Sequence, residues 1–164
     1  MSTQLLTTQE SLALGAWVRL LRGHAAARRS LSTELQTGHG LTVNDYEALL
    51  LLSRAEANCM RRVDLAEGLQ LTASGVTRLL DGLEKHGLVE KATCSSDARV
   101  TYAVLTKAGR RKLEEASCSH VAAIRALFEE RYTHRELATL AELLARLPGT
   151  ANADEGECVP DPAH

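Results

Sequence analysis

Apolar side chains recur at intervals of three and four residues along most of the chain, and this spacing predicts helices. The expected helices cover residues 9–36, 42 to about 57, 61–68, 72–86, 106–131 and 133–147. Thr42 and Thr133 are each followed three positions later by an acidic residue, which is the pattern of a capping box. The segment 37–40 has glycine at two of its four positions and is expected to end the first helix.

The helix expected after Thr72 separates an apolar face from a polar one. Its apolar positions follow the spacing i, i+3, i+4, i+7 and are Val76, Leu79, Leu80 and Leu83. Thr72 is expected to cap its start, and Gly87 is expected to end it. The other face carries small hydroxyl residues followed by an arginine. This combination suits a helix that lies in the major groove of DNA.

Two short β-prone runs, 88–92 and 100–105, follow this helix and are separated by a polar turn. A recognition helix followed by a hairpin with an arginine in its turn predicts a winged helix. Arg99 would reach a minor groove, where the negative potential attracts arginine, and Asp97 could brace its guanidinium. Together with the short helix at 61–68, the pattern predicts a winged helix-turn-helix.

These segments resemble the MarR (multiple antibiotic resistance regulator) family of transcription factors. The resemblance rests on SGVTRLLD at 74–81, LEKHGLV at 83–89, DAR at 97–99 and LT at 105–106. It implies a homodimer, a palindromic operator in double-stranded DNA, and repression released by a small ligand. The expected fold is therefore mostly α with a small β-hairpin wing: a winged helix-turn-helix at 42–105, flanked by N- and C-terminal dimerisation helices at 9–36 and 106–148.

The predicted DNA contacts come from the second and third helices of this unit and from the wing. Ser74, Thr77 and Arg78 are expected to reach bases or phosphates, and Thr72 and Lys85 to contact only the backbone. Arg61 and Arg62 fit a phosphate contact and a solvated helix start equally well. The resemblance implies the minor-groove position for the wing arginine. The complete set of predicted DNA-binding residues is Arg61, Arg62, Thr72, Ser74, Thr77, Arg78, Lys85, Ser95, Ser96, Asp97 and Arg99.

Polar residues interrupt the apolar stripe of the first helix. Trp17, His24 and Arg28 lie along this stripe, where a buried polar group is costly without a partner. They either belong to a packed core with a satisfied histidine or line an effector pocket. The resemblance implies a pocket between the first helix and the winged unit for a small aromatic carboxylate or phenol. Arg28 or Arg19 could hold a carboxylate and His24 a hydroxyl, while Trp17 with Asp64 resembles a pair in urate-responsive members.

Length and charge add limits to this interpretation. A chain of 164 residues predicts one domain, which we place at 1–148, followed by an acidic tail at 149–164 expected to be disordered. The net charge is -2, but residues 54–111 hold ten Lys/Arg against seven Asp/Glu, which fits a DNA-binding segment. No apolar run suits a membrane span and no signal peptide is recognisable, so we expect a cytoplasmic protein.

Other functions remain as alternatives. The four cysteines lie far apart and form no CxxC, which argues against a zinc ribbon or a disulfide framework. A redox-sensing regulator could still act through Cys94 in the wing or Cys59 before the third helix. A helical dimer could also use its winged unit for protein contacts without an operator. We find no phosphate loop, nucleophile elbow or HxxxH pair, so neither an enzyme nor a cofactor or metal site is expected.

Overall fold

The computed structural model describes residues 8–93 and 100–149, and within them the chain is mostly helical with a small antiparallel sheet. The elements in chain order are α1 (Thr8–His39), α2 (Val43–Arg54), the short 3-10 helix η1 (Glu56–Asn58), β1 (Cys59–Arg61), α3 (Arg62–Gly68), α4 (Ala73–Lys85), β2 (Val89–Thr93), β3 (Thr101–Leu105), α5 (Lys107–Glu129) and α6 (His134–Leu144). The expected mostly α fold with a β-hairpin wing is confirmed. None of the helices in these ranges is both long and apolar enough to span a membrane.

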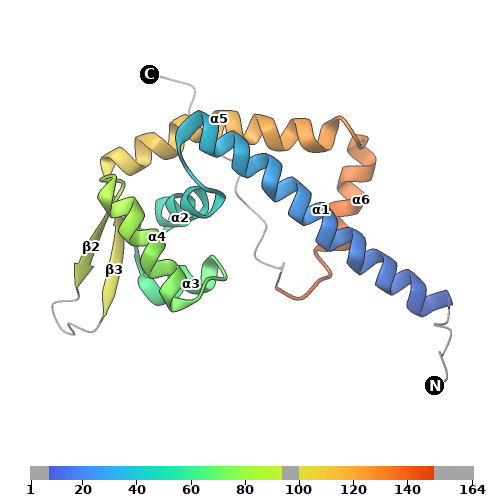
Figure 1. The fold of residues 1–164 in the computed structure, drawn as a ribbon, viewed down its shortest axis with the longest axis horizontal. Helices are drawn as coiled ribbons and strands as arrows, with labels where there is room; N and C mark the ends of the chain where they lie inside the picture. Colours follow the sequence, from blue (N-terminus) through green and yellow to red (C-terminus); the bar gives the residue numbers. More distant parts are fainter. Residues whose placement is uncertain (1–7, 94–99, 150–164) are drawn as a thin grey trace.

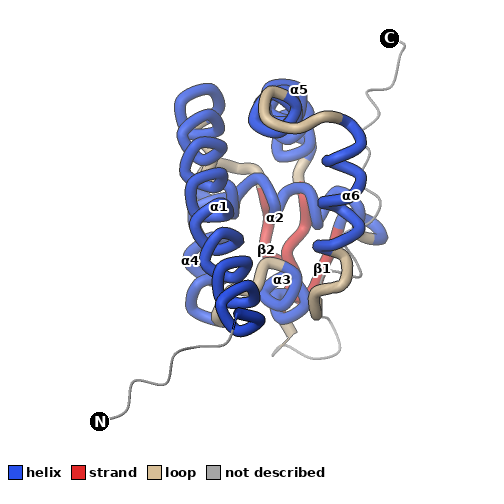
Figure 2. The backbone as a smooth tube through the Cα atoms, turned by 90° about the vertical axis from the view of Figure 1, so that its right-hand side faces the viewer, coloured by secondary structure: helices blue, strands red, loops and turns tan. Residues whose placement is uncertain are grey.

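The elements form a compact winged unit with a helical arm beside it. The winged unit runs from α2 to β3, and α1 and α5 pass over it before the N-terminal half of α1 and all of α6 extend to one side (Figure 1). The strand order in the sheet is β1-β3-β2, and both neighbouring pairs are antiparallel. Helix α2 contacts the sheet as well as α1 and α5, so it forms the centre of the unit (Figure 2).

The helix starts are set by local capping, as the sequence predicts. The Thr42 hydroxyl accepts the Asp45 N–H at 3.1 Å, and the Asp45 carboxylate accepts the Thr42 N–H at 2.8 Å. Thr133 and Glu136 form the same reciprocal box at the start of α6. At α4, the Thr72 hydroxyl accepts the Gly75 N–H at 3.1 Å. Each cap satisfies a backbone donor that has no partner inside its helix.

The end of the first helix was predicted too early. Helix α1 continues through Gly38 to His39, and only Gly40 adopts a left-handed backbone, with a φ of 67°. The Gly40 N–H bonds to the Gln36 carbonyl at 3.0 Å, and the Leu41 N–H bonds to that of Leu35 at 3.3 Å. Gly40 is therefore the residue that ends the helix, because a glycine adopts positive φ without a steric penalty.

The sequence pattern does not predict the strand β1, so the expected ends of the two helices beside it are displaced. Helix α2 ends at Arg54 rather than near residue 57, and α3 begins at Arg62 rather than Arg61. Between them Cys59, expected in a loop, pairs with Val104 of β3. Arg61 is the last residue of this strand. Three residues are too few to show an alternating pattern, so the strand depends on its partner in the sheet. At the other end of the chain, α6 ends at Leu144, short of the predicted 147.

The hydrophobic core lies inside the winged unit. Its largest fully buried side chains are Leu35, Leu49, Leu52, Leu65, Leu80, Val76 and Val89. Among these, α1 contributes only Leu35, near its C-terminal end, and α6 contributes no buried residue in the described range. The N-terminal part of the apolar stripe predicted along α1 is exposed in the single chain, with Leu14 at 50% and Trp17 at 56% exposure.

A polar cluster joins the long helices to the centre of the winged unit. His120 of α5 is 4% exposed, and its Nδ1 lies 3.2 Å from a carboxylate oxygen of Glu34 in α1. The Ser119 hydroxyl donates to the other oxygen of Glu34 at 2.7 Å. On the α2 side, the Tyr46 ring contacts the His120 ring at a tilt of 55°, with centroids 4.6 Å apart. The buried imidazole thus has a polar partner, as burial of such a group requires.

Candidate nucleic-acid interface

Helices α3 and α4 are joined by a tight turn that fixes their relative orientation. Leu69 ends α3, and Gln70 adopts a left-handed backbone with a φ of 53°. The Leu71 N–H then bonds back to the Ala66 carbonyl at 2.9 Å, just before Thr72 caps α4. Leu65, Val76 and Leu80 are buried between the two helices and the rest of the core. This arrangement is a helix-turn-helix.

The face of α4 opposite the core carries the predicted contacts. Ser74, Arg78 and Lys85 are exposed there, at the spacing of one helical face. The Ser74 hydroxyl lies 3.2 Å from that of Thr72, and the hydroxyls of Thr72 and Thr77 have backbone partners as well. The Thr72 oxygen caps the helix, while the Thr77 hydroxyl donates to the Ala73 carbonyl at 2.8 Å. Both threonines therefore hold the helix in shape.

The two arginines at the start of α3 have different surroundings. Arg61 donates two hydrogen bonds to Asp64, at 2.7 and 2.6 Å. These hydrogen bonds raise the pKa of Arg61 and lower the pKa of Asp64. Arg62 lies across the helix-turn-helix and points its Nη1 to the Thr77 hydroxyl at 3.4 Å. Arg62 is therefore placed beside α4, whereas Arg61, at the end of β1, is bound to Asp64 in the first turn of α3.

The hairpin of β2 and β3 forms the wing. Its ladder runs from the Val89–Leu105 pair to the Thr93–Thr101 pair. The predicted wing contacts Ser95, Ser96, Asp97 and Arg99, and the candidate redox residue Cys94, lie outside the described residues. Within the described part, Lys91 of β2 forms ion pairs with Asp81 and Glu84 of α4. Lys91 is not among the predicted contacts, although its position two residues after the buried Val89 places it on the inner side of the strand.

A hollow of about 530 Å³ lies between α1, α2 and the turn before α4. Its polar lining includes His24, Arg28, Asn44 and Glu47. Arg28 donates a hydrogen bond to the Asn44 side chain, and its other terminal nitrogen lies 3.7 Å from Glu47. Asn44 and Glu47 are not among the predicted ligand residues, and they lie three residues apart on one face of α2.

Two of the five predicted ligand residues come together in this hollow. His24 and Arg28 line it, while Trp17, Arg19 and Asp64 do not. Trp17 lies in the exposed part of α1, and Arg19 donates to the Gly15 carbonyl one turn earlier at 3.1 Å. The Asp64 carboxylate is held by the Arg61 guanidinium.

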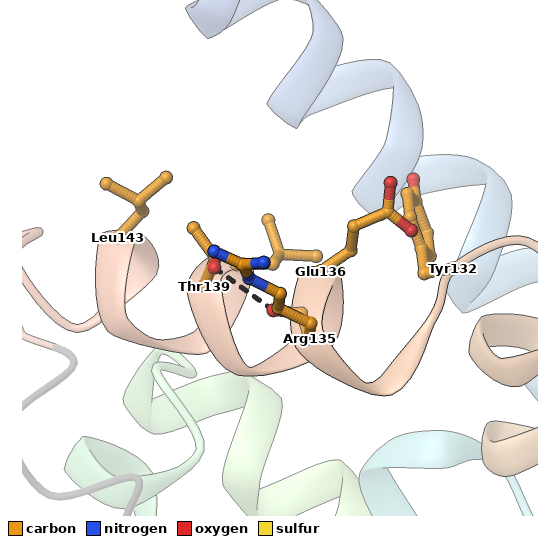
Figure 3. A pocket seen from close by; sticks show the side chains of 6 residues that line it. Tyr132, Arg135, Glu136, Thr139 and Leu143 are labelled. Atoms are coloured by element: carbon orange, nitrogen blue, oxygen red, sulfur yellow. Dashed lines mark hydrogen bonds between the residues drawn. The ribbon is translucent and has the colours of Figure 1, made fainter.

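A second, shallower groove of about 360 Å³ lies along α6. Figure 3 shows Tyr132, Glu136 and Leu143 along it, with the Thr139 hydroxyl donating to the Arg135 carbonyl at 3.0 Å. The groove belongs to the arm and lies outside the helix-turn-helix, so it takes no part in the surface that carries Arg78.

The turn, the exposed face of α4 and the hairpin beside it define a winged helix-turn-helix protein, a class that reads DNA with a helix in the major groove. Residues 39–100 match the MarR family. AbsC, a MarR family transcriptional regulator from Streptomyces coelicolor, is 33% identical over 87% of this chain and 93% of its own, with a TM-score of 0.74. The chain belongs to the MarR family of DNA-binding transcriptional regulators.

Two further relatives were solved with different molecules bound. Sco3205 of Streptomyces coelicolor, solved in complex with DNA, is 27% identical over 87% of this chain and 88% of its own, with a TM-score of 0.76. CouR of Rhodococcus jostii RHA1, solved with p-coumaroyl-CoA, is 25% identical over 77% of this chain and 86% of its own, with a TM-score of 0.65. The HTH-type transcriptional repressor YetL of Bacillus subtilis is 30% identical over 67% of this chain. The match spans 65% of YetL and about half of the next curated relatives.

Proposed function

We propose that the protein is a homodimeric repressor that binds a palindromic operator and is released from it by a small aromatic anion. The observation that carries the DNA-binding part is the face of α4 on which Ser74, Arg78 and Lys85 are exposed together. Two copies of α4 would enter successive major grooves, about 34–36 Å apart, while the wings reach the flanking minor grooves. Repression is supported by the relative YetL, which is a repressor.

Arg78 is the residue we assign to base recognition. Its guanidinium has five donors in a fixed fork and can bind the O6 and N7 atoms of guanine together. Ser74, one turn before it, would contact a base edge or a phosphate. Arg62 and Lys85 would bind phosphates on either side, and Thr72 and Thr77 would support the helix. In the wing, we retain Arg99 as the minor-groove contact.

The exposed apolar residues of the arm support a homodimer. Large apolar side chains are exposed on the two helices of the arm and on α5, and they include Leu12, Leu14, Trp17, Leu21, Val121 and Leu143. Such a set on the surface of one chain marks an interaction site, and a symmetric pair of arms would cover it. The dimer would also set the distance between the two copies of α4.

The hollow between α1 and α2 supports an anionic effector. Arg28 supplies a positive charge at its wall, which an anion would share with Glu47 at 3.7 Å, and four leucines supply an apolar surface for a ring. Because the hollow also touches the turn before α4, a ligand could favour one orientation of the helix-turn-helix over another. The relative CouR was solved with p-coumaroyl-CoA, whose phenolic ring supports the aromatic part of this ligand.

A titration of the purified protein with DNA from the region flanking its own gene tests the proposal. Fluorescence anisotropy at two salt concentrations should show tight binding that weakens steeply with salt, because phosphate contacts release counterions. Arg78→Ala should weaken binding by about 1–3 kcal/mol. Arg111→Ala is the control. This exposed arginine lies in α5, which follows β3 at the opposite end of the hairpin from the turn of the wing. Equal loss in both variants would refute base recognition by Arg78.

A further inference from the structure

Within the described residues of the hairpin, apolar contacts are concentrated at the end next to α4 and α5. On its inner side, Val89 and Leu105 pair with each other and are buried, and the next inner pair is Lys91 with Ala103. Ala103 is also buried, but it offers only a methyl group. The last inner pair is Thr93 with Thr101, where Thr93 is exposed. The apolar layer between the hairpin and the helices therefore ends at the level of Lys91.

Lys91 connects the hairpin to α4 at this point. Its Nζ lies 3.0 Å from a carboxylate oxygen of Glu84 and also binds the carboxylate of Asp81, one turn earlier on α4. Among the residues that the structure describes, no other side chain of β2 or β3 makes an ion pair or side-chain hydrogen bond with α4. The two carboxylates raise the pKa of Lys91, so the ammonium keeps its charge at neutral pH.

We propose that Lys91 is a positioning residue for DNA binding, which fixes the angle between the wing and the recognition helix α4. This inference rests on the proposed function, in which α4 and the wing engage neighbouring grooves. One ammonium that bridges two carboxylates a helical turn apart favours one orientation of the strand relative to α4. Without this tie, the wing would have to be ordered at the moment of binding, and that ordering would reduce affinity.

The surroundings of Lys91 argue against a role in stability alone. The Lys91 side chain is 31% exposed, and those of Asp81 and Glu84 are 56% and 45% exposed. Ion pairs this open to water contribute little to folding, because solvent screens them. Asp81 also shares the exposed face of α4 with Arg78 and Lys85, and Lys91 neutralises a carboxylate that would otherwise face the phosphates. The effect of the residue should therefore be seen in DNA binding.

The test compares three variants of the full chain by operator affinity, hydroxyl-radical footprint and thermal unfolding. Lys91→Met keeps the length of the side chain and removes its charge, and Lys91→Arg restores the charge. Glu90→Gln is the control, a neighbouring exposed charge on the outer side of the strand. We expect Lys91→Met to bind up to about fivefold more weakly and to lose protection of the flanking minor grooves, while the major grooves stay protected. Lys91→Arg and Glu90→Gln should resemble the wild type.

Other outcomes separate the inference from the proposed function. A wild-type footprint in Lys91→Met would overturn the positioning role. So would a uniform loss of protection that follows a fall in unfolding temperature of more than about 4 °C, since that indicates a stability effect. A wild-type protein that protects no flanking minor grooves would instead refute the wing contact in the proposed function, and the inference with it.

Discussion

The backbone of Gly109 in the first turn of α5 lies directly against the carbonyl group of Leu88. A Cβ atom at position 109 would come within 2.1 Å of that carbonyl oxygen and 2.8 Å of a methyl group of Leu105. Thr106 holds the same junction, because its N–H bonds to the Leu88 carbonyl at 3.2 Å and its hydroxyl donates to the Gly87 carbonyl at 2.7 Å. The end of α4 and the start of α5 are thus tied together through the backbone.

Gly109→Ala should therefore destabilise the fold. The added methyl group meets a backbone carbonyl that cannot move aside as a flexible side chain would, so we expect a loss of roughly 3 kcal/mol in the free energy of unfolding. Gly82→Ala is the matched control, because no atom lies within 4 Å of its Cβ position and the residue is inside α4. Alanine at position 82 should raise the free energy of unfolding by about 0.5–1 kcal/mol. Urea unfolding of the free protein measures both, and equal stabilities would contradict the packing argument.

The cap of α4 gives a second prediction. Thr72→Ala should cost about 1 kcal/mol of stability, because the Gly75 N–H loses its acceptor. Thr72→Ser should keep most of the wild-type stability, since serine is an equally good cap. If operator affinity falls in proportion to stability and recovers with serine, Thr72 acts through the helix. A loss of affinity with unchanged stability would instead indicate a direct DNA contact.

The capping threonines could be predicted from sequence because the interaction spans only three residues. Each of the three caps accepts the N–H of the residue three positions later, so the sequence signal is local. The threonines are Thr42, Thr72 and Thr133. The recognition helix can be predicted for a similar reason, since the spacing of its apolar and polar residues is visible within one element.

The features that were missed depend on residues distant in the chain. The strand at Cys59 is extended because β3 pairs with it, and Gly109 is required by the carbonyl of a residue twenty-one positions earlier. The hollow between α1 and α2 includes both predictable residues and residues that could not be predicted. His24 and Arg28 follow from the stripe of one helix, whereas their neighbours Asn44 and Glu47 come from α2 and could be assigned only once the two helices were placed together.

The capping box of α6 predicts a pH dependence. Hydrogen bonds from the backbone N–H and hydroxyl of Thr133 lower the pKa of Glu136. A carboxylate with a lowered pKa in the folded state contributes stability above its unfolded pKa, near 4.3, and this contribution is lost as pH falls through the folded value. Glu136→Gln keeps the shape of the box without the charge. Urea midpoints measured from pH 6 to pH 3 should fall less steeply in this variant, and parallel curves would contradict the assignment.

The hollow predicts a difference between two adjacent arginines of α1. Arg28 lines it, whereas Arg29 is exposed and does not. If a phenolic acid such as p-coumarate releases the operator, Arg28→Ala should raise the concentration needed at least about tenfold, because a charged hydrogen bond to the carboxylate is lost. Arg29→Ala should leave it unchanged. Anisotropy of labelled operator measures the release, and the same response in both variants would place the ligand elsewhere.

The exposed apolar residues of the arm predict the oligomeric state. Leu143 is 50% exposed and lines the groove along α6, so Leu143→Glu would place a charge in the proposed dimer interface. Burying an unpaired carboxylate there is costly, and the variant should be a monomer at concentrations where the wild type is a dimer. Val63→Glu is the control, because Val63 is even more exposed, at 61%, but lies on α3 within the winged unit. Sedimentation equilibrium distinguishes the two: a dimeric Leu143→Glu would exclude this part of α6 from the interface, and a monomeric Val63→Glu would extend the interface beyond the arm.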